Sequence, residues 1–505
     1  MKRHRALALA MLTSCASAPT THGLPRVATP AVSTDPRQAT AAASAERPAT
    51  SASPPPRPER PAVWPSFAEE DRALLAQMVS VDTSRGGETG LLEPIAARYR
   101  SAGVPAQILE SAPGRGNLIA RLKGNGKKRP LLLLAHVDVV PVDGQTWTVP
   151  PFAVTEKDGF LWGRGVNDDK GMAAAIVAVS LELARTAAPL TRDIIVALTS
   201  GEETGGSAGV RWLTENHPDL IEAAIALNEG GATLLRDDFS KAVVVSVGVS
   251  EKTFQTFRLV THGKGGHSSL PPTNGDPVVA LARALVKLGD HRFSARVLPE
   301  VAASFNAQLA SAEPAYLEAL RHAIRTAPRL APVDEAVLSR DAAYNAEVRT
   351  TCVTTMLKGA AQDNVLPTTA EATVNCRILP GDTLEAVRAE LVATIGDPAV
   401  EVVLGPALGE SAGSPFEGEV VAAIRKAASD TFPGTPVVPA MGTGATDSRH
   451  LRRIGILAYG VSPTVYTRAE ALGAHVAHGP DERTSLQWLR PMTDYFREIV
   501  RTLAL

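Results

Sequence analysis

The sequence predicts an α/β protein whose main domain is a doubly wound, mixed sheet, with a smaller α+β domain inserted into it. Two patterns predict this arrangement. Between residues 106 and 227, short apolar runs typical of buried strands alternate with helical runs, as in a sheet covered on both faces. Between residues 250 and 410 the order becomes βαββαβ, which suits a small antiparallel sheet with two helices on one face.

Apolar periodicity assigns the elements of the main domain in order. We expect two helices within 69–103, strands at 106–109, 117–122 and 131–135, a hairpin at 152–163, a helix at 171–185, a strand at 192–199, a helix at 207–216 and a strand at 223–227. A helix at 417–431 and a strand at 454–459 return to the same pattern near the C-terminus. Residues 66–249 and 411–505 are therefore predicted to form one domain.

The inserted domain is predicted to occupy residues 250–410. We expect a strand at 254–261, a helix at 276–288, strands at 349–357 and 370–379, a helix at 384–395 and a strand at 400–404, with a helical insertion at 292–347. Cys352 and Cys376 fall opposite each other if the two central strands pair about residue 364. A disulfide and two half-buried thiols are both compatible with this pairing.

The amino terminus has the outline of an export signal. A basic start, Met1 to Arg5, precedes a short apolar stretch that ends in Leu12-Thr-Ser-Cys15, which resembles a bacterial lipobox. We therefore expect residues 1–15 to be a signal peptide and Cys15 to carry lipid at the cell envelope, in the periplasm or at the outer membrane. The alternative is ordinary cleavage near Ala18. Residues 16–65 are rich in Pro, Ala, Ser and Thr and predict a disordered tether.

The composition is that of an ordinary globular protein. The 51 basic residues nearly balance the 53 acidic ones, so net charge gives no indication of nucleic-acid binding. The only membrane contact that the sequence predicts is the lipid anchor.

Acidic and histidine residues gather where apolar strand-like runs stop. Because open α/β sheets bind ligands beyond the carboxyl ends of their strands, these side chains are expected to share one crevice. Such a set of acids requires cations or protons for neutralisation, and histidine mixed with carboxylates favours zinc, with manganese or cobalt as alternatives. The residues are His136, Asp138, Asp168, Asp169, Glu202, Glu203 and Glu229.

These segments resemble the dinuclear zinc hydrolases that include carboxypeptidase S, aminoacylase, glutamate carboxypeptidase and succinyl-diaminopimelate desuccinylase. The run from His136 to Pro141 and the helical insertion resemble the carboxypeptidase S branch most. The resemblance implies two zinc ions, one held by His136 and Glu229, the other by Glu203 and His478, with Asp168 shared between them. His475 is the alternative to His478.

The same resemblance implies the remaining roles. Asp138 would orient His136, Glu202 would be the general base, and the peptide bond between Asp168 and Asp169 would be cis. In the inserted domain, which would be a ferredoxin-like lid and dimerisation domain, His267 would stabilise the oxyanion. Asn364 and Arg377 would grip a substrate carboxylate, although a surface salt bridge is the ordinary role for such an arginine.

The sequence therefore predicts an exported, lipid-anchored metallopeptidase or amidohydrolase. It would release a C-terminal amino acid from short peptides or N-acyl amino acids, and a homodimer through the lid domain is a further expectation. The alternative is a catalytically inactive surface lipoprotein that binds peptide or metal. Loss of Glu202 or of a ligand would indicate that alternative, and the sequence retains them all.

Overall fold

The computed structural model describes residues 67–273, 275–405, 412–471 and 477–505. All of them belong to one compact unit, Arg57–Leu505. The predicted lipobox at Cys15, the tether at 16–65 and the alternative ligand His475 lie outside the described residues. No helix in the described ranges combines the length and apolar character that a membrane span needs.

A ten-stranded mixed sheet forms the main domain, as predicted. Its strands are β1 (Ala106–Glu110), β2 (Gly116–Leu122), β3 (Leu131–His136), β6 (Ile194–Thr199), β7 (Ile225–Asn228), β8 (Ala232–Leu235), β9 (Ala242–Glu251), β16 (Val437–Gly442), β17 (Leu457–Gly460) and β18 (Val465–Thr467). Their order is β1-β2-β6-β3-β7-β17-β9-β8-β18, and β16 pairs with β9. Neighbours among β6, β3, β7 and β17 run parallel, so the carboxyl ends of these four strands share one edge.

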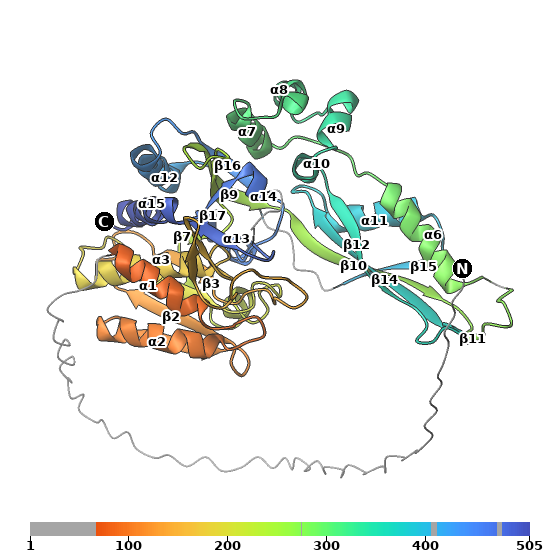
Figure 1. The fold of residues 1–505 in the computed structure, drawn as a ribbon, viewed down its shortest axis with the longest axis horizontal. Coiled ribbons are helices and arrows are strands. Elements are labelled where there is room, and N and C mark those ends of the chain that lie inside the picture. Colours follow the sequence, from red (N-terminus) through yellow and green to blue (C-terminus); the bar gives the residue numbers. More distant parts are fainter. Residues whose placement is uncertain (1–66, 274, 406–411, 472–476) are drawn as a thin grey trace, which may run out of the picture. The chain divides into compact units, whose positions relative to one another are not determined.

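Helices cover both faces of this sheet (Figure 1). Successive residues of a strand point to opposite faces, so Leu133 and Val196 join one core while Leu132 and Ile195 join the other. The helices of the first core are α1 (Phe67–Val79), α2 (Glu88–Ser101), α3 (Lys170–Arg185), α12 (Gly418–Thr431) and α15 (Leu486–Ala504). Those of the second are α4 (Val210–Asn216), α5 (Pro218–Ile221) and α13 (Ser448–Arg453).

The inserted segment builds a separate antiparallel sheet, in the order β12-β14-β10-β15. Its chain order is βαββαβ: β10 (Thr253–His262), α6 (Pro277–Asp290), β12 (Thr351–Lys358), β14 (Thr369–Ile378), α11 (Leu384–Ile395) and β15 (Val400–Leu404). Both helices pack on one face of this sheet, in a core that includes Phe257, Leu281 and Leu391. Cys352 pairs with Cys376 in the β12–β14 register, and the two form a disulfide.

Four helices make up the predicted helical insertion. They are α7 (Pro299–Gln308), α8 (Pro314–Thr326), α9 (Pro332–Leu338) and α10 (Ala342–Val348). Their core includes Phe305, Leu320 and Tyr344, and it also takes in Met441 from β16 of the main sheet. The insertion is therefore packed against the main domain, a contact that the sequence did not predict.

Short elements complete the chain. β4 (Thr155–Lys157), β5 (Phe160–Trp162) and β19 (Arg483–Ser485) form a small sheet, β11 (Gly266–His267) pairs with β13 (Val365–Leu366), and α14 (Arg468–Ala471) follows β18. The pairing of β19 with β5 brings the segment after His478 beside the segment that leads to Asp168.

Candidate metal centre

The parallel strands bring the predicted ligands to one edge of the main sheet. His136 is the last residue of β3, Glu229 directly follows β7, and Glu202 and Glu203 lie in the turn after β6. These strands are neighbours in the order β6-β3-β7. Asp168 stands just before α3, and its peptide bond to Asp169 is cis, as the resemblance implied.

The cluster divides into two groups of three possible ligands. His136, Glu202 and Glu229 form one group, and Asp168, Glu203 and His478 form the other. Within each group the nearest ligand atoms lie within 4.8 Å of one another. The structure thus brings together residues that the sequence separates by more than three hundred positions.

Asp168 lies between the two groups. Its Oδ1 is 2.9 Å from Nε2 of His136, and its Oδ2 is 3.2 Å from Nε2 of His478. Nε2 of His478 also lies 3.0 Å from Oε2 of Glu203. Each oxygen of one carboxylate therefore faces a different histidine, which is the geometry that a shared ligand requires.

Asp138 organises the segment behind these ligands. Nδ1 of His136 lies 3.0 Å from the Asp138 carbonyl oxygen and 3.5 Å from its carboxylate. A proton on Nδ1 would leave Nε2 as the free lone pair, which is the common state of a metal-binding histidine. The Asp138 carboxylate also accepts hydrogen bonds from the backbone N–H groups of Glu202 and Glu203, at 3.1 and 3.2 Å.

Glu482 positions the loop that carries Asp168. Its carboxylate is fully buried and accepts hydrogen bonds from the backbone N–H groups of Gly165 and Asn167, both at 2.9 Å. It also pairs with Arg164 at 2.8 Å. The sequence places Glu482 in the pattern that selects His478, but its role as an anchor for the opposite loop became visible only in the structure.

Charge is poorly balanced in this cluster. Burial raises the pKa of Glu202 and of Glu229 well above the ordinary range, and neighbouring carboxylates add to the effect. Hydrogen bonds to Asp168 and Glu203 raise the pKa of His478 to about 10. Burial also raises the pKa of Asp169 well above the ordinary range.

These observations fit a pair of divalent cations. Oε1 of Glu203 is buried without a hydrogen-bond partner among the described residues, and so are both carboxylate oxygens of Asp169. Buried acids without compensating charge are unstable unless they bind protons or metal ions. Imidazole nitrogens and carboxylate oxygens are also a suitable donor set for zinc and similar ions.

The predicted substrate-binding residues lie in the inserted domain. His267 and Asn364 are exposed and adjacent, because Ser268 donates its backbone N–H to the Asn364 carbonyl at 3.0 Å. The structure records no contact between this pair and the described metal ligands. Arg377 does interact with this cluster, because its guanidinium feels the charge of Glu202. The same guanidinium lies 4.7 Å from the centre of the Phe254 ring.

Two charged residues that interact with predicted site residues were missed from the sequence. Asp447 and Arg449, next to and within α13, interact electrostatically with Glu202 and Arg377 respectively. The Asp447 carboxylate is buried with no hydrogen-bond partner in the described chain, and its pKa is raised to about 7 by burial. An acid and an arginine in a glycine-rich loop were the available sequence features, and they are too common to indicate a site.

Known proteins are similar to this chain in sequence. The chain is 30% identical to the N-fatty-acyl-amino acid synthase/hydrolase of Homo sapiens over 381 residues, 74% of each chain. It is 28% identical to a probable carboxypeptidase S-like protein of Dictyostelium discoideum over 385 residues, 74% of this chain and 71% of that protein. These relatives are named as a hydrolase and a carboxypeptidase.

Solved structures have the same fold at low sequence identity. The M20 family metallo-carboxypeptidase of Sulfolobus solfataricus matches with a TM-score of 0.64 and 18% identity, over 86% of this chain and 99% of that one. A dinuclear metal-binding peptidase of Bacillus subtilis matches with a TM-score of 0.54 and 16% identity, over 86% and 97%. The sequence profile described as peptidase family M20/M25/M40 matches residues 132–502. This confirms the resemblance: the chain belongs to the hydrolases of peptidase family M20/M25/M40.

Proposed function

We propose that this chain is a dizinc amidohydrolase that releases a C-terminal amino acid from short peptides or N-acyl amino acids. The observation that carries the proposal is Asp168, whose two oxygens face His136 and His478 at 2.9 and 3.2 Å. His136 and Glu229 would hold one ion, Glu203 and His478 the other, and Asp168 both. When bound, two such ions supply an acidified water and polarise the amide carbonyl.

Glu202 would move the proton. It shares a group with His136 and Glu229, so its carboxylate is close to the water that would attack the amide. Its carboxylate oxygen would accept a proton from this water and later deliver it to the nitrogen of the leaving amine. Asp138 supports this role because it fixes the backbone of Glu202 through a 3.1 Å hydrogen bond.

The inserted domain would recognise the substrate. Nδ1 of His267 accepts the backbone N–H of Ser269 at 3.1 Å, which assigns the ring proton to Nε2, the donor that an oxyanion needs. Arg377 offers the planar guanidinium suited to a carboxylate, and Asn364 would assist it. Arg449, which interacts with Arg377, adds a second cation to this region.

Variants at the adjacent glutamates test the assignment. Glu202→Ala should retain two metal ions per chain and lose most turnover, whereas Glu203→Ala should lose metal as well as turnover. Metal content measured by mass spectrometry and amino-acid release from dipeptides and N-acyl amino acids give the two readouts. Equal metal loss in both variants would show that the two roles are misassigned. Turnover that survives a strong chelator would refute the metal mechanism.

The assembly and location are part of the proposal. Val353, Met356 and Leu357 on the edge strand β12 are 60%, 53% and 65% exposed, which supports a homodimer formed through the inserted domain. Met356→Glu should then shift the mass measured by light scattering from dimer to monomer. We also propose that lipid on Cys15 holds the enzyme at the bacterial cell envelope, as the lipobox resemblance implies.

A further inference from the structure

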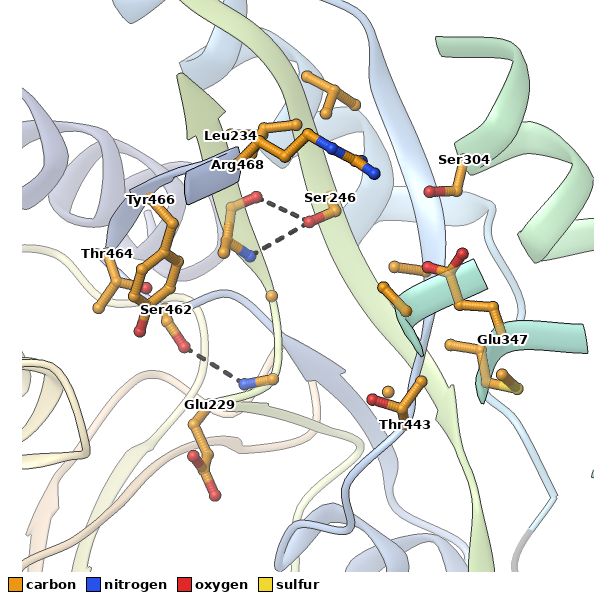
Figure 2. Close-up of a pocket in the computed structure, with 18 of the residues that line it drawn as sticks. Glu229, Leu234, Ser246, Ser304, Glu347, Thr443, Ser462, Thr464, Tyr466 and Arg468 are labelled. Atoms are coloured by element: carbon orange, nitrogen blue, oxygen red, sulfur yellow. Dashed lines mark hydrogen bonds between the residues drawn. The ribbon is translucent and has the colours of Figure 1, made fainter. Parts of the chain in front are cut away.

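A cavity extends from the metal ligands to the helical insertion. Its volume is about 440 Å³, and its lining includes Asp168 and Glu229 at the candidate metal centre. Ser304 of α7 and Glu347 of α10 also line it. Figure 2 shows Glu229 on one side and Ser304 and Glu347 across from it. A part of the substrate that extends from the metal ligands into this cavity would therefore reach the helical insertion.

The lining of the cavity indicates which end of the substrate it would hold. Glu202, Arg377 and Asn364, which would handle the leaving amine and its carboxylate, are absent from its lining. The amide carbonyl must lie at the metal ligands, with the amino-acid side directed toward Arg377. The cavity beside Asp168 and Glu229 is then left for the acyl side.

Glu347 is an unusual residue for the wall of an acyl subsite. Glu347 is half-buried and lines the cavity, yet its carboxylate forms no hydrogen bond or ion pair with the described residues. Burial, followed by the charge of Asp341, raises the pKa of Glu347 to about 7. An ionised Glu347 therefore has no ion-pair partner of its own among the described residues.

Arg468, the cation whose charge acts on Glu347, already has other partners. Arg468 lies 3.0 Å from Asp341 and 3.6 Å from Glu313, and it donates a 3.3 Å hydrogen bond to the Tyr344 hydroxyl. Arg468 therefore acts on three carboxylates of the described chain, because its charge also partly offsets the rise in the pKa of Glu347. The excess negative charge favours a cation supplied by the ligand.

We propose that the helical insertion forms a subsite for acyl groups that end in an ammonium, which Glu347 binds. This inference rests on the proposed hydrolysis of peptides or N-acyl amino acids and specifies the acyl class. The ammonium comes either from the ω-amine of an acyl chain or from a lysyl side chain of a peptide.

The charge distinguishes this subsite from one for plain alkyl chains. Leu234, Val244 and Met441 give the cavity apolar walls that suit methylene groups. An alkyl chain that reaches Glu347 would remove water from the carboxylate without replacing its hydrogen bonds, which is unfavourable. An ammonium of the same length would replace them.

Matched substrates test the subsite in the metal-loaded full chain. The first pair is 6-aminohexanoyl and heptanoyl amides of one amino acid, which have equal length and differ in the terminal ammonium or methyl. The second pair is lysyl and 2-aminoheptanoyl dipeptides, which separates the peptide source from the acyl source. We expect kcat/KM to favour the ammonium member of at least one pair by about tenfold, as for a hydrogen bond to a charged group.

Substitution of Glu347 tests whether its carboxylate causes the preference for ammonium substrates. Glu347→Gln keeps the size of the side chain and should remove the preference while retaining turnover of the alkyl substrates. Glu347→Asp should keep part of it. The matched control is Glu318→Gln on α8, whose side chain is 80% exposed and pairs only with a surface arginine among the described residues, Arg321.

The outcomes separate the two proposals. A wild-type enzyme that hydrolyses both members of each pair equally overturns the subsite and leaves the hydrolase proposal intact. A preference that persists in Glu347→Gln overturns the role of this residue. Failure of the metal-loaded wild type to hydrolyse any of the four substrates overturns the proposed function together with the subsite.

Discussion

Replacement of Asp138 by asparagine should damage metal binding and stability together. The Asp138 side chain is 4% exposed, and its two carboxylate oxygens accept from the backbone N–H groups of Glu202 and Glu203. Asparagine has nearly the same shape but only one acceptor oxygen. In Asp138→Asn, one of the two N–H groups must therefore face an amide NH2 instead of an acceptor.

The geometry gives the size of the effect. A hydrogen bond to a charged group contributes about 1.5–3 kcal/mol, and a buried donor left unpaired costs about 1–3 kcal/mol. Since one bond is lost and the other loses its charge, we expect the free energy of unfolding to fall by about 2–4 kcal/mol. Metal affinity should fall by about 10- to 100-fold, because Asp138 also supports His136 and the turn that carries Glu203.

Urea unfolding of the metal-free protein and a competitive metal titration measure these two quantities. Asp143→Asn is the matched control, because the Asp143 side chain is 65% exposed and forms only a surface ion pair with Arg85 in the described chain. Surface pairs of this kind contribute less than about 1 kcal/mol. If Asp138→Asn loses turnover but keeps wild-type stability and metal affinity, the anchoring role is wrong.

Three further predictions concern other parts of the chain. Burial and Asp494 raise the pKa of Asp71 from 3.8 to about 8, so the folded state holds a proton that the unfolded chain releases. The free energy of unfolding should therefore fall as pH rises from 3.8 toward about 8, by up to ~1.4 kcal/mol per pH unit. Asp71→Asn should remove this pH dependence, which urea unfolding at about pH 5 and about pH 8 would measure. Cys352 and Cys376 should react with an alkylating agent only after reduction, which mass spectrometry would detect; alkylation of the unreduced, unfolded protein would contradict the disulfide. Cys15→Ser should abolish incorporation of labelled fatty acid, and equal labelling of variant and wild type would rule out lipidation at this residue.

The gathering of the candidate metal ligands was predictable because each ligand lies next to a strand that its own short segment reveals. His136 ends one strand and Glu229 directly follows another, and all residues of both strands are buried. The strand and the position of the ligand were therefore visible in the same short segment. Parallel pairing of neighbouring strands then brings such positions together without any further information. The cis bond at Asp168 and the role of His478 came from the resemblance rather than from the pattern.

Other features were not predictable because they depend on packing between distant segments. β16 contains Pro439, which argues against a strand in the sequence. The structure tolerates this proline because, among the described strands, β16 pairs only with β9 and so lies at an edge. The contact of the helical insertion with Met441 on that strand was therefore also hidden. Without this contact, nothing in the sequence connects Glu347 to the metal ligands.

The packing of the insertion would separate the two proposed halves of substrate recognition. Arg377 belongs to β14 of the inserted sheet and would bind the carboxylate of the leaving amino acid. Glu347 lies on α10, whose core includes Met441 of the main sheet, and it would bind the acyl end. Because the two residues act on opposite sides of the scissile amide and share no contact in the described structure, acyl preference can change without a change in the preference for the leaving amino acid. The proposed metal centre would activate water in either case, so selectivity in this chain would depend on the two segments that the ligand motifs do not include.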